Sequence, residues 1–484
     1  MKHPILTSVL AFSLSTSCLP VLAGLDPERP DYNIPDLNEL LAPAPASAKP
    51  SSTNPAALSG LSDASLGLKQ LREERAAGTL IEDPELSVWL RHLGNRLLAH
   101  APVGNNRFYF VLSKDLDVNA YATQGGLIVV NAGLILTTTS ESELAAVMAH
   151  EIAHVTQRHI TRMQDDGPKG ALMTGIGVLA GAAAASKSPD AAEAIIASTV
   201  ATQAHKQLGF SRQMEAEADR VGLRILAGAG FDPLGMSSFM EKLDRRTSDL
   251  NSDLTQYLRS HPLSIDRVSD TRSRAEQMGS RMVADSVSYR YARERLRVLV
   301  QSRSGAATTD PQLTQYVQAL RQLRGGGGKG VIQTLGGNAA SLPSALLLAQ
   351  AYNLNGQPAA AIKALAPYAN NAQEDVLIPL AEAYVANDQA TQAWQVVSRY
   401  NLTEQTSLDF LDLRQRVAEQ AGQAVEAYRS AAERSIRMGE YRQARAVLEQ
   451  ATRLPNTPAA TAARLQAMAQ EVARLENTTK HFKR

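Results

Sequence analysis

SESELAAVMAHEIAH, residues 140–154, contains a helix start followed by a His-Glu-x-x-His motif. Ser140 and Glu143 have the spacing of a capping box, which predicts that a helix begins here. Apolar residues then recur with the helical period, at Leu144, Val147, Met148 and Ile152. Because a helix has 3.6 residues per turn, His150 and His154 share one face and lie one turn apart.

Two histidines in this arrangement can bind one zinc ion, and Glu151 is placed to remove a proton from an attacking water molecule. The alternative interpretation is a solvated helix face that carries two unrelated histidines. The apolar character of the rest of the helix argues against that alternative. The motif therefore predicts a zinc hydrolase site in which Glu151 is the general base.

A second helix, predicted from Ser211 to near Gly230, offers the third protein ligand that zinc hydrolases need. Glu215 and Asp219 are four residues apart and share a face, whereas Glu217 points elsewhere. One of the two can bind the metal while the other accepts a hydrogen bond from an imidazole and orients that ring. The spacing alone leaves open which carboxylate has which role.

His-Glu-x-x-His followed about 60 residues later by Glu-x-x-Ala-Asp resembles the gluzincin metallopeptidases related to HtpX and the CAAX prenyl protease, over roughly residues 66–275. The resemblance implies that His150, His154 and Glu215 bind zinc (Zn2+), one ion per chain, and that Asp219 orients a ligand. It also implies a mainly α fold with a small β-sheet in a zincin-type metallopeptidase domain, and the activity of a zinc metalloendopeptidase.

A His-Pro sequence follows at His261-Pro262. The resemblance implies that His261 can occupy the open zinc position and hold the enzyme latent. Stabilisation of the tetrahedral oxyanion during turnover is the alternative role. The third interpretation is a loop histidine that caps a turn. Arg267, five residues after Pro262, is a candidate partner for a carboxylate of the site.

Two short runs rich in β-forming residues, 108–112 and 127–130, predict strands. The segment 119–131 is either an exposed edge strand that pairs with an extended substrate or a structural strand in the core of the sheet. The other histidines of this region have no ligand spacing and are interpreted as ordinary polar residues: His92, His100, His159 and His205.

The N-terminus predicts export. Lys2 precedes a short apolar run, and Val21-Leu22-Ala23 has the pattern that a signal peptidase recognises. We therefore expect a signal peptide over residues 1–23, cleaved after Ala23, and a location in the periplasm. A lipoprotein attached through Cys18 is the alternative. Residues 24–65 are rich in Pro and Ala and predict a flexible leader.

Residues 276–330 are predicted to form a helical connector that ends in a flexible glycine-rich hinge at residues 325–330. In residues 331–484, LAQAY at 348–352 recurs as LAEAY at 380–384. A turn residue followed five positions later by Ala occurs at Gly356, Asp388 and Gly439. This pattern resembles tetratricopeptide repeats and predicts an α-helical solenoid with a concave binding groove. An ordinary helical bundle is the alternative.

Composition excludes some partners. The 49 Lys and Arg residues are balanced by 48 Asp and Glu residues, so there is no basic field for nucleic acid. The apolar stretch 171–185 is shorter than a membrane span. It predicts helical structure beside the active site, with peripheral contact to a membrane surface or to a β-barrel protein as a further possibility.

The resemblance implies quality control and assembly of outer-membrane β-barrel proteins. Unfolded or stalled barrel proteins would be the substrates. The repeat domain would have chaperone-like activity and would bind the barrel-assembly machinery. The alternative belongs to a different class: a non-proteolytic repeat scaffold or chaperone with a latent or structural zinc site. Replacement of Glu151 separates the two, because only an enzyme needs that side chain.

Overall fold

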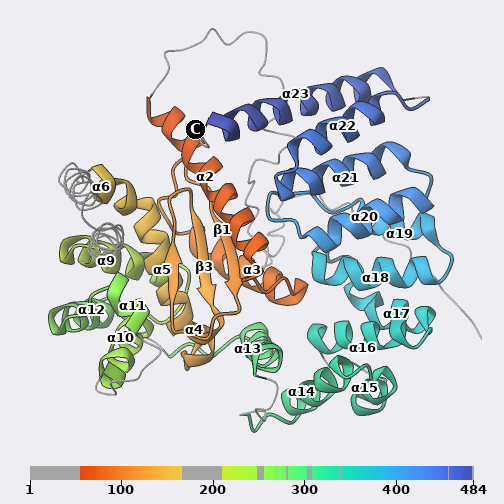
Figure 1. Cartoon of the computed structure of the whole chain (residues 1–484). Coiled ribbons are helices and arrows are strands. Elements are labelled where there is room, and N and C mark those ends of the chain that lie inside the picture. The colour runs from red at the N-terminus through yellow and green to blue at the C-terminus, as the bar shows by residue number, and fades with distance from the viewer. Residues whose placement is uncertain are drawn as a thin grey trace, which may run out of the picture.

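The computed structural model describes residues 55–165, 210–247, 255–279, 282–301, 308–337, 339, 341–455 and 457–481. The predicted signal peptide, most of the predicted leader and the apolar stretch 171–185 lie outside the described residues. The described part is mainly helical and contains one three-stranded sheet (Figure 1). Within it, no helix combines the length and the apolar character that crossing a bilayer requires.

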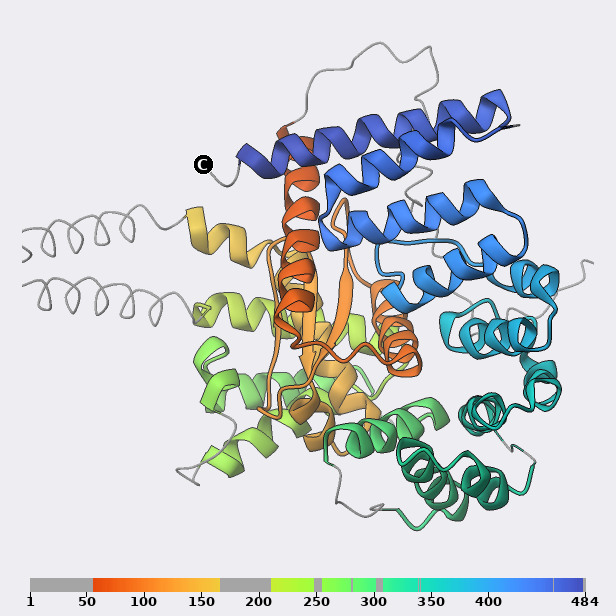
Figure 2. The same ribbon diagram turned by 45° about the vertical axis from the view of Figure 1, so that its right-hand side comes forward.

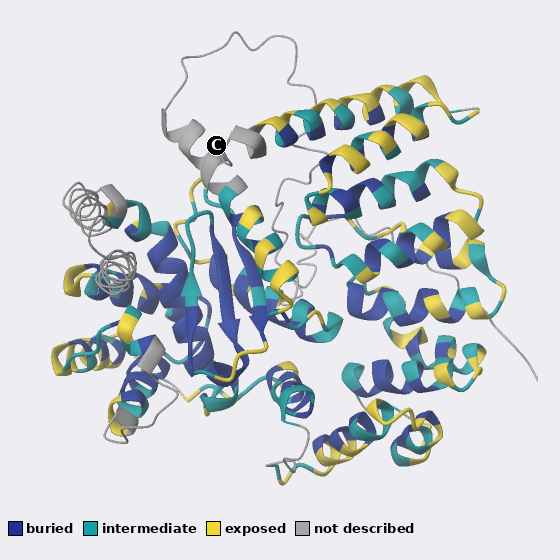
Figure 3. Ribbon diagram, viewed as in Figure 1, coloured by how far each residue is buried: buried dark blue, intermediate teal, exposed yellow. Residues whose placement is uncertain are grey.

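Helix α5, Glu141–Thr156, lies at the buried centre of the N-terminal half (Figure 3). Its start agrees with the predicted cap, because the Ser140 hydroxyl accepts a hydrogen bond from the Glu143 N–H. The Glu143 carboxylate turns back to the N–H of Thr139 rather than to that of Ser140, and it also pairs with Lys242. These contacts fix the position from which the helix enters the core.

The sheet has the order β1-β3-β2, with β1 at Tyr109–Ser113, β2 at Ala120–Ala122 and β3 at Leu127–Asn131. β3 pairs parallel with β1 and antiparallel with β2. The two predicted β-rich runs are therefore strands. The structure divides segment 119–131 between a core strand and an edge strand. β3 is a central strand that is buried along its whole length, whereas β2 is an edge strand that contacts α5.

The main apolar core joins one face of the sheet to the surrounding helices, and a smaller apolar cluster that includes Leu71 packs on the other face. Besides α5, the N-terminal half contains α2 (Pro55–Ala77), α3 (Pro84–Leu98), α4 (Ala132–Thr137), α6 (His159–Asp165), α9 (Arg212–Gly228), α10 (Leu234–Thr247), α11 (Thr255–Ser260) and α12 (Ile265–Gln277). Helix α9 packs directly on α5 because Gly222 has no side chain. A Cβ there would come within 3.2 Å of the His150 backbone nitrogen. This close approach brings the carboxylates of α9 to the histidine face of α5.

The C-terminal half is an array of helices in which each helix packs against the next. The helices are α13 (Val287–Val300), α14 (Pro311–Arg324), α15 (Gly328–Leu335), α16 (Leu342–Leu354), α17 (Pro358–Leu365) followed by the 3-10 helix η1 (Ala366–Tyr368), α18 (Glu374–Ala386), α19 (Ala390–Val397), α20 (Leu408–Gln420), α21 (Ala424–Met438), α22 (Tyr441–Thr452) and α23 (Ala459–His481). Both views show the array running along one side of the N-terminal half (Figures 1 and 2).

Three boundaries differ from the predicted division. Helix α2 begins at Pro55, inside the predicted leader. Helix α13 belongs to both halves, because Tyr289 enters the N-terminal core while Tyr291 packs with α14. The glycine run predicted as a hinge is instead the turn between α14 and α15. Its glycines serve conformation rather than flexibility: Gly326 has φ +75°, and Gly328 is buried at the start of α15.

The repeated sequence positions have equivalent places in the array. Gly356, Asp388 and Gly439 each lie between two helices with a positive φ, of 66°, 56° and 76° respectively. The small residues five positions later are all fully buried: Ala361, Ala393 and Ala444. Gly422, in the turn between α20 and α21, also has a positive φ, of 71°, and Ala427 five positions later is buried, so the pattern recurs there before the turn at Gly439.

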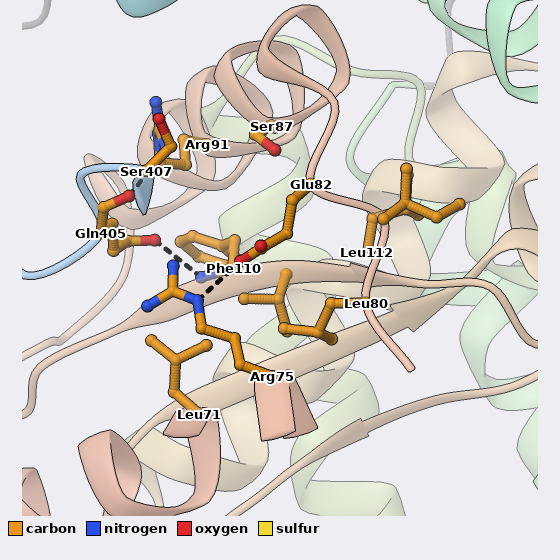
Figure 4. Close-up of a pocket in the computed structure, with 12 residues that line it drawn as sticks. Leu71, Arg75, Leu80, Glu82, Ser87, Arg91, Phe110, Leu112, Gln405 and Ser407 are labelled. Atoms are coloured by element: carbon orange, nitrogen blue, oxygen red, sulfur yellow. Dashed lines mark hydrogen bonds and ion pairs between the residues drawn. The ribbon is translucent and has the colours of Figure 1, made fainter. Parts of the chain in front are cut away.

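The loop before α20 joins the array to the edge of β1 (Figure 4). The Gln405 side chain accepts a hydrogen bond from the Phe110 N–H at 3.0 Å and donates one to the Phe108 carbonyl at 3.4 Å, as a neighbouring strand would. The adjacent Glu404 accepts a hydrogen bond from the Tyr109 hydroxyl at 2.7 Å. The loop therefore covers part of the sheet edge and fixes the array against the sheet.

Two buried carboxyl groups at the start of α18 lie at the same junction. Glu374 pairs with Arg91 of α3 across the two halves. Burial raises the pKa of the neighbouring Asp375 to about 6, above its ordinary value of 3.8. Between these two pH values the folded protein keeps a proton that the unfolded chain has lost. The free energy of unfolding therefore falls as the pH rises through this window.

We expect Asp375→Asn to remove this loss, because the amide has no proton to give up. The free energy of unfolding should rise by up to about 3 kcal/mol at pH 8 and should be nearly unchanged at pH 3.5. Urea unfolding of both proteins at the two pH values measures this difference. An effect of equal size at both would show that the ionisation of Asp375 is not its cause.

Candidate metal centre

Helices α5 and α9 bring two histidines and two carboxylates together in the core. The His150 and His154 rings are buried, and their Nε2 atoms are 2.9 Å apart. Glu215 faces both rings, with one carboxylate oxygen 3.5 Å from His150 Nε2 and the other 3.4 Å from His154 Nε2. Asp219 lies 3.0 Å from the opposite nitrogen of His150, Nδ1. The two carboxylates thus take the two separate places that the spacing left open.

His261 joins this group from the segment between α11 and α12. Its Nδ1 lies 3.3 Å from His150 Nε2 and 3.1 Å from Glu215 Oε1. The ring is buried against Tyr257, with the ring centroids 4.7 Å apart. One ligand atom from each of His150, His154, Glu215 and His261 lies within 4.8 Å of the others. Bonds of about 2.0–2.1 Å to a tetrahedral zinc ion would place such atoms about 3.4 Å apart, so this donor set suits zinc.

The hydrogen-bond partners of His150 favour a positive charge at the centre of the group. His150 Nδ1 donates to Asp219, so Nε2 of the neutral ring carries a lone pair that faces His154 Nε2. Burial lowers the pKa of His150, but hydrogen bonds to Asp219 and Glu215 raise it to about 10. A dication between the Nε2 atoms and Glu215 would supply this charge and leave both rings neutral. The residues therefore fit a metal ion.

Glu151 lies between the edge strand and the histidine group. Its Oε2 accepts a hydrogen bond from the Ala122 N–H of β2 at 3.0 Å, and its Oε1 lies 3.4 Å from His261 Nε2. Burial raises the pKa of Glu151, although the charges of His261 and His150 oppose the shift. A raised pKa makes this carboxylate a better proton acceptor. His261 faces the ligand group through one nitrogen and Glu151 through the other.

Arg267 is the buried cation opposite the two carboxylates of α9. Its guanidinium binds Asp219 through two nitrogens, at 2.8 and 2.9 Å, and lies 2.8 Å from Glu215 Oε2. Burial raises the pKa of Asp219, but hydrogen bonds from His150 and Arg267 outweigh this effect and lower it. The structure therefore places Arg267 where the sequence analysis put it as a candidate, beside a carboxylate of the site.

The interpretation of His159 as an ordinary polar residue is wrong. His159 is buried, and its Nδ1 lies 3.0 Å from His154 Nδ1. A separation of five residues is no ligand spacing on a continuous helix, but α5 ends at Thr156 and the chain turns back through Arg158, which has φ 56°. No glycine or proline in the sequence marks the turn at Arg158, so local spacing does not predict this contact.

Phe210 is a second residue of the site that sequence reasoning missed. Its ring centroid is 3.9 Å from that of His154 and 5.7 Å from that of His261. This contact carries no local signal, because it depends on tertiary packing. His92 and His100 do not join the group, and His205 lies outside the described residues. Glu217 faces away from the group and is partly exposed.

Two histidines on one helix, a glutamate on a second helix and the Glu151 carboxylate beside them are the arrangement of a metallopeptidase site. In agreement with this geometry, residues 84–275 match Peptidase family M48. This part of the chain is therefore a metallopeptidase domain of family M48, and it contains every ligand of the group described above.

The chain is also similar to individual metalloproteases. It is 37% identical over 245 residues to the beta-barrel assembly-enhancing protease of Escherichia coli (strain K12). The aligned residues cover 51% of this chain and 50% of the relative. It is 34% identical over 290 residues to the putative beta-barrel assembly-enhancing protease of Vibrio cholerae. This alignment covers 60% of this chain and 56% of that relative. It is 34% identical over 145 residues to mitochondrial metalloendopeptidase OMA1 of Arabidopsis thaliana, an alignment that covers 30% of this chain and 27% of that relative. The chain spans about half the length of the assembly-enhancing proteases that it matches.

Proposed function

We propose that this protein is a zinc-dependent endopeptidase that acts in the quality control and assembly of outer-membrane β-barrel proteins. The observation that carries the catalytic part is the convergence of His150, His154 and Glu215 on one point, with Glu151 beside it. The similarity to the two beta-barrel assembly-enhancing proteases supports the part that concerns barrel proteins.

The side chains of the site have separate roles in peptide hydrolysis. His150, His154 and Glu215 would hold the zinc ion, which when bound polarises a peptide carbonyl and acidifies water. Glu151 removes the proton of the attacking water and later delivers it to the leaving amine. Asp219 holds the proton of His150 Nδ1 and thereby keeps that ring in its orientation.

The edge strand β2 is the proposed binding place for the substrate backbone. It lies beside Glu151, whose carboxylate already accepts a hydrogen bond from the Ala122 N–H. An extended peptide can add to such an edge by main-chain hydrogen bonds, which are independent of side-chain identity. We therefore expect cleavage to require an unfolded segment more than a particular sequence.

His261 is the proposed latch of the site. Three protein ligands would leave the fourth zinc position open for chemistry, and the His261 ring, which lies with the ligand group and faces Glu151, would occupy it. We expect His261→Ala to cleave an unfolded protein such as casein at least about tenfold faster than wild type, because the active arrangement no longer has to compete with the closed one. Release of labelled peptides by the zinc-loaded full chain measures this rate.

The matched control is His100→Ala, which removes an exposed histidine of the same domain and should leave the rate unchanged. Zinc content must stay at one ion per chain in all three proteins. Slower cleavage by His261→Ala, with zinc retained, would contradict the latch and would favour stabilisation of the oxyanion as the role of His261.

The location and the partners form a further part of the proposal. The export pattern of residues 1–23 supports a periplasmic protein, and a mass increase at Cys18 would instead indicate the lipoprotein alternative. The turns at Gly356, Asp388 and Gly439 support a tetratricopeptide-like array. The similarity to the beta-barrel assembly-enhancing proteases supports the proposal that this array binds the barrel-assembly machinery and has chaperone-like activity. Peripheral membrane contact is assigned to the apolar stretch 171–185.

A non-proteolytic scaffold with a structural zinc site is the second candidate. The observation that favours it is the fourth side chain in the ligand group, since structural zinc sites are fully occupied by protein ligands. In that case Glu151→Gln would leave the function in barrel assembly intact. Complementation of a deletion strain by Glu151→Gln therefore separates the scaffold from the enzyme.

A further inference from the structure

A chain of hydrogen-bonded side chains lies behind His154, on the side of the ring that faces away from the ligand group. His154 Nδ1 is 3.0 Å from His159 Nδ1. His159 Nε2 is 3.2 Å from Glu217 Oε2, and the same oxygen accepts a hydrogen bond from Arg162 at 3.0 Å. The peptide hydrolysis described above uses none of these three outer residues.

The direction of these hydrogen bonds follows from the ligand role of His154. A metal bound at Nε2 leaves the ring proton of His154 on Nδ1, so Nδ1 donates to His159 Nδ1. His159 must then carry its own proton on Nε2, where the Glu217 carboxylate accepts it. Each donor thus has one acceptor, and the chain ends at a carboxylate held by Arg162.

The two ligand histidines differ in the groups that their Nδ1 atoms contact. His150 Nδ1 is held directly by the Asp219 carboxylate at 3.0 Å. His154 has no carboxylate at Nδ1, and His159 stands in that place. Ligand histidines usually donate their second N–H to an acceptor that fixes the ring, and the loss of that acceptor weakens metal binding. The orientation of His154 therefore depends on His159.

The backbone around His159 is arranged for this contact. Arg158 adopts φ 56°, a conformation that non-glycine residues rarely take, and this turn starts α6 at His159. The His159 ring is fully buried, and Phe210 packs against the His154 ring. The energetically costly backbone conformation of Arg158 thus places the His159 imidazole beside the end of α5.

We propose that His159 is a positioning residue of the metal centre, which accepts the Nδ1 proton of His154 and passes the hydrogen-bond chain on to Glu217. This role rests on the proposed zinc site. The zinc affinity of the protein tests this role, and its measurement needs no substrate and no turnover. The loss of such a hydrogen-bond acceptor weakens metal binding by about 10–100-fold.

The test measures the zinc dissociation constant of the full chain by competition with a fluorescent chelator. His159→Leu removes both hydrogen bonds and should raise the dissociation constant by about 10–100-fold. His159→Gln can accept from His154 through its carbonyl and donate to Glu217 through its amide, so it should stay within about threefold of wild type. Glu217→Ala, at a partly exposed position, should weaken binding by a smaller factor than His159→Leu and by a larger factor than His159→Gln. The control is His100→Gln.

The outcomes are distinct. A dissociation constant for His159→Leu equal to that of wild type would overturn the proposal, as would His159→Gln binding as weakly as His159→Leu, since the ring would then only fill space. If His159→Leu does not fold, the zinc dissociation constants of Glu217→Ala and His159→Gln are compared instead. Equal dissociation constants for these two variants would overturn the proposal. Failure of the wild type to bind zinc would instead remove the proposed metal site itself.

Discussion

Glu151→Gln is expected to abolish peptide cleavage, with a fall of at least about 100-fold. The amide has nearly the volume of the carboxylate and can still accept the hydrogen bond from the Ala122 N–H. It cannot take a proton from water, so the variant loses the general base and keeps the fold. Because His261 is the proposed latch of the wild type, the loss is measured best in the His261→Ala background, where the expected starting rate is higher.

Zinc content is the internal control for this loss. Glu151 is not a member of the ligand group, so Glu151→Gln should keep one zinc ion per chain. Glu276 is exposed on α12, so Glu276→Gln in the His261→Ala background should leave the cleavage rate unchanged. If His261→Ala/Glu151→Gln cleaved as fast as His261→Ala, Glu151 would not be the base, and the assignment of the catalytic chemistry would fail.

Arg267→Met is expected to cause the largest loss of stability. Arg267 is the buried cation that pairs with both Asp219 and Glu215. Without it, two buried carboxylates lose their guanidinium partner, and breaking one buried ion pair typically costs about 3–5 kcal/mol. The free energy of unfolding of the metal-free protein should fall by this amount at pH 7, as measured by urea titration.

Arg272→Met is the matched control on the same helix. Arg272 is exposed and pairs with Glu241 and Glu276 at the surface, where an ion pair contributes about 0–1 kcal/mol. The pH dependence has a defined sign. Pairing lowers the folded-state pKa of Asp219, so the stability from this pair is present above the ordinary pKa of 3.8 and is lost as the pH falls. Equal losses for both arginine variants at pH 7 would contradict the buried network.

Local periodicity was sufficient for the central part of the site. The helical spacing places His150 and His154 on one face of α5, and the same argument places Glu215 and Asp219 on one face of α9. Spacing along one helix could not assign the two carboxylates, because their roles depend on how α9 crosses α5. That crossing is set by Gly222, which allows the two backbones to approach.

Contacts between distant segments could not be predicted. His159 reaches His154 only because the chain turns at Arg158, and Phe210 reaches the same ring from a segment about 50 residues away. Gln405 pairs with the edge of β1 across almost 300 residues of sequence, and nothing in its local pattern indicates a strand partner. Composition does not distinguish a mobile hinge from a turn that needs positive φ, so the glycine run at residues 325–330 predicts a hinge where the structure has a turn.

X-ray absorption at the zinc edge tests the central claim most directly, since it reports the ligands of the metal itself. The wild-type chain should bind one zinc ion through three imidazoles and one carboxylate, and His261→Ala should show one imidazole fewer with the zinc content unchanged. A protein without zinc, or a spectrum that is identical for wild type and His261→Ala, would contradict a latched metallopeptidase centre built from His150, His154, Glu215 and His261.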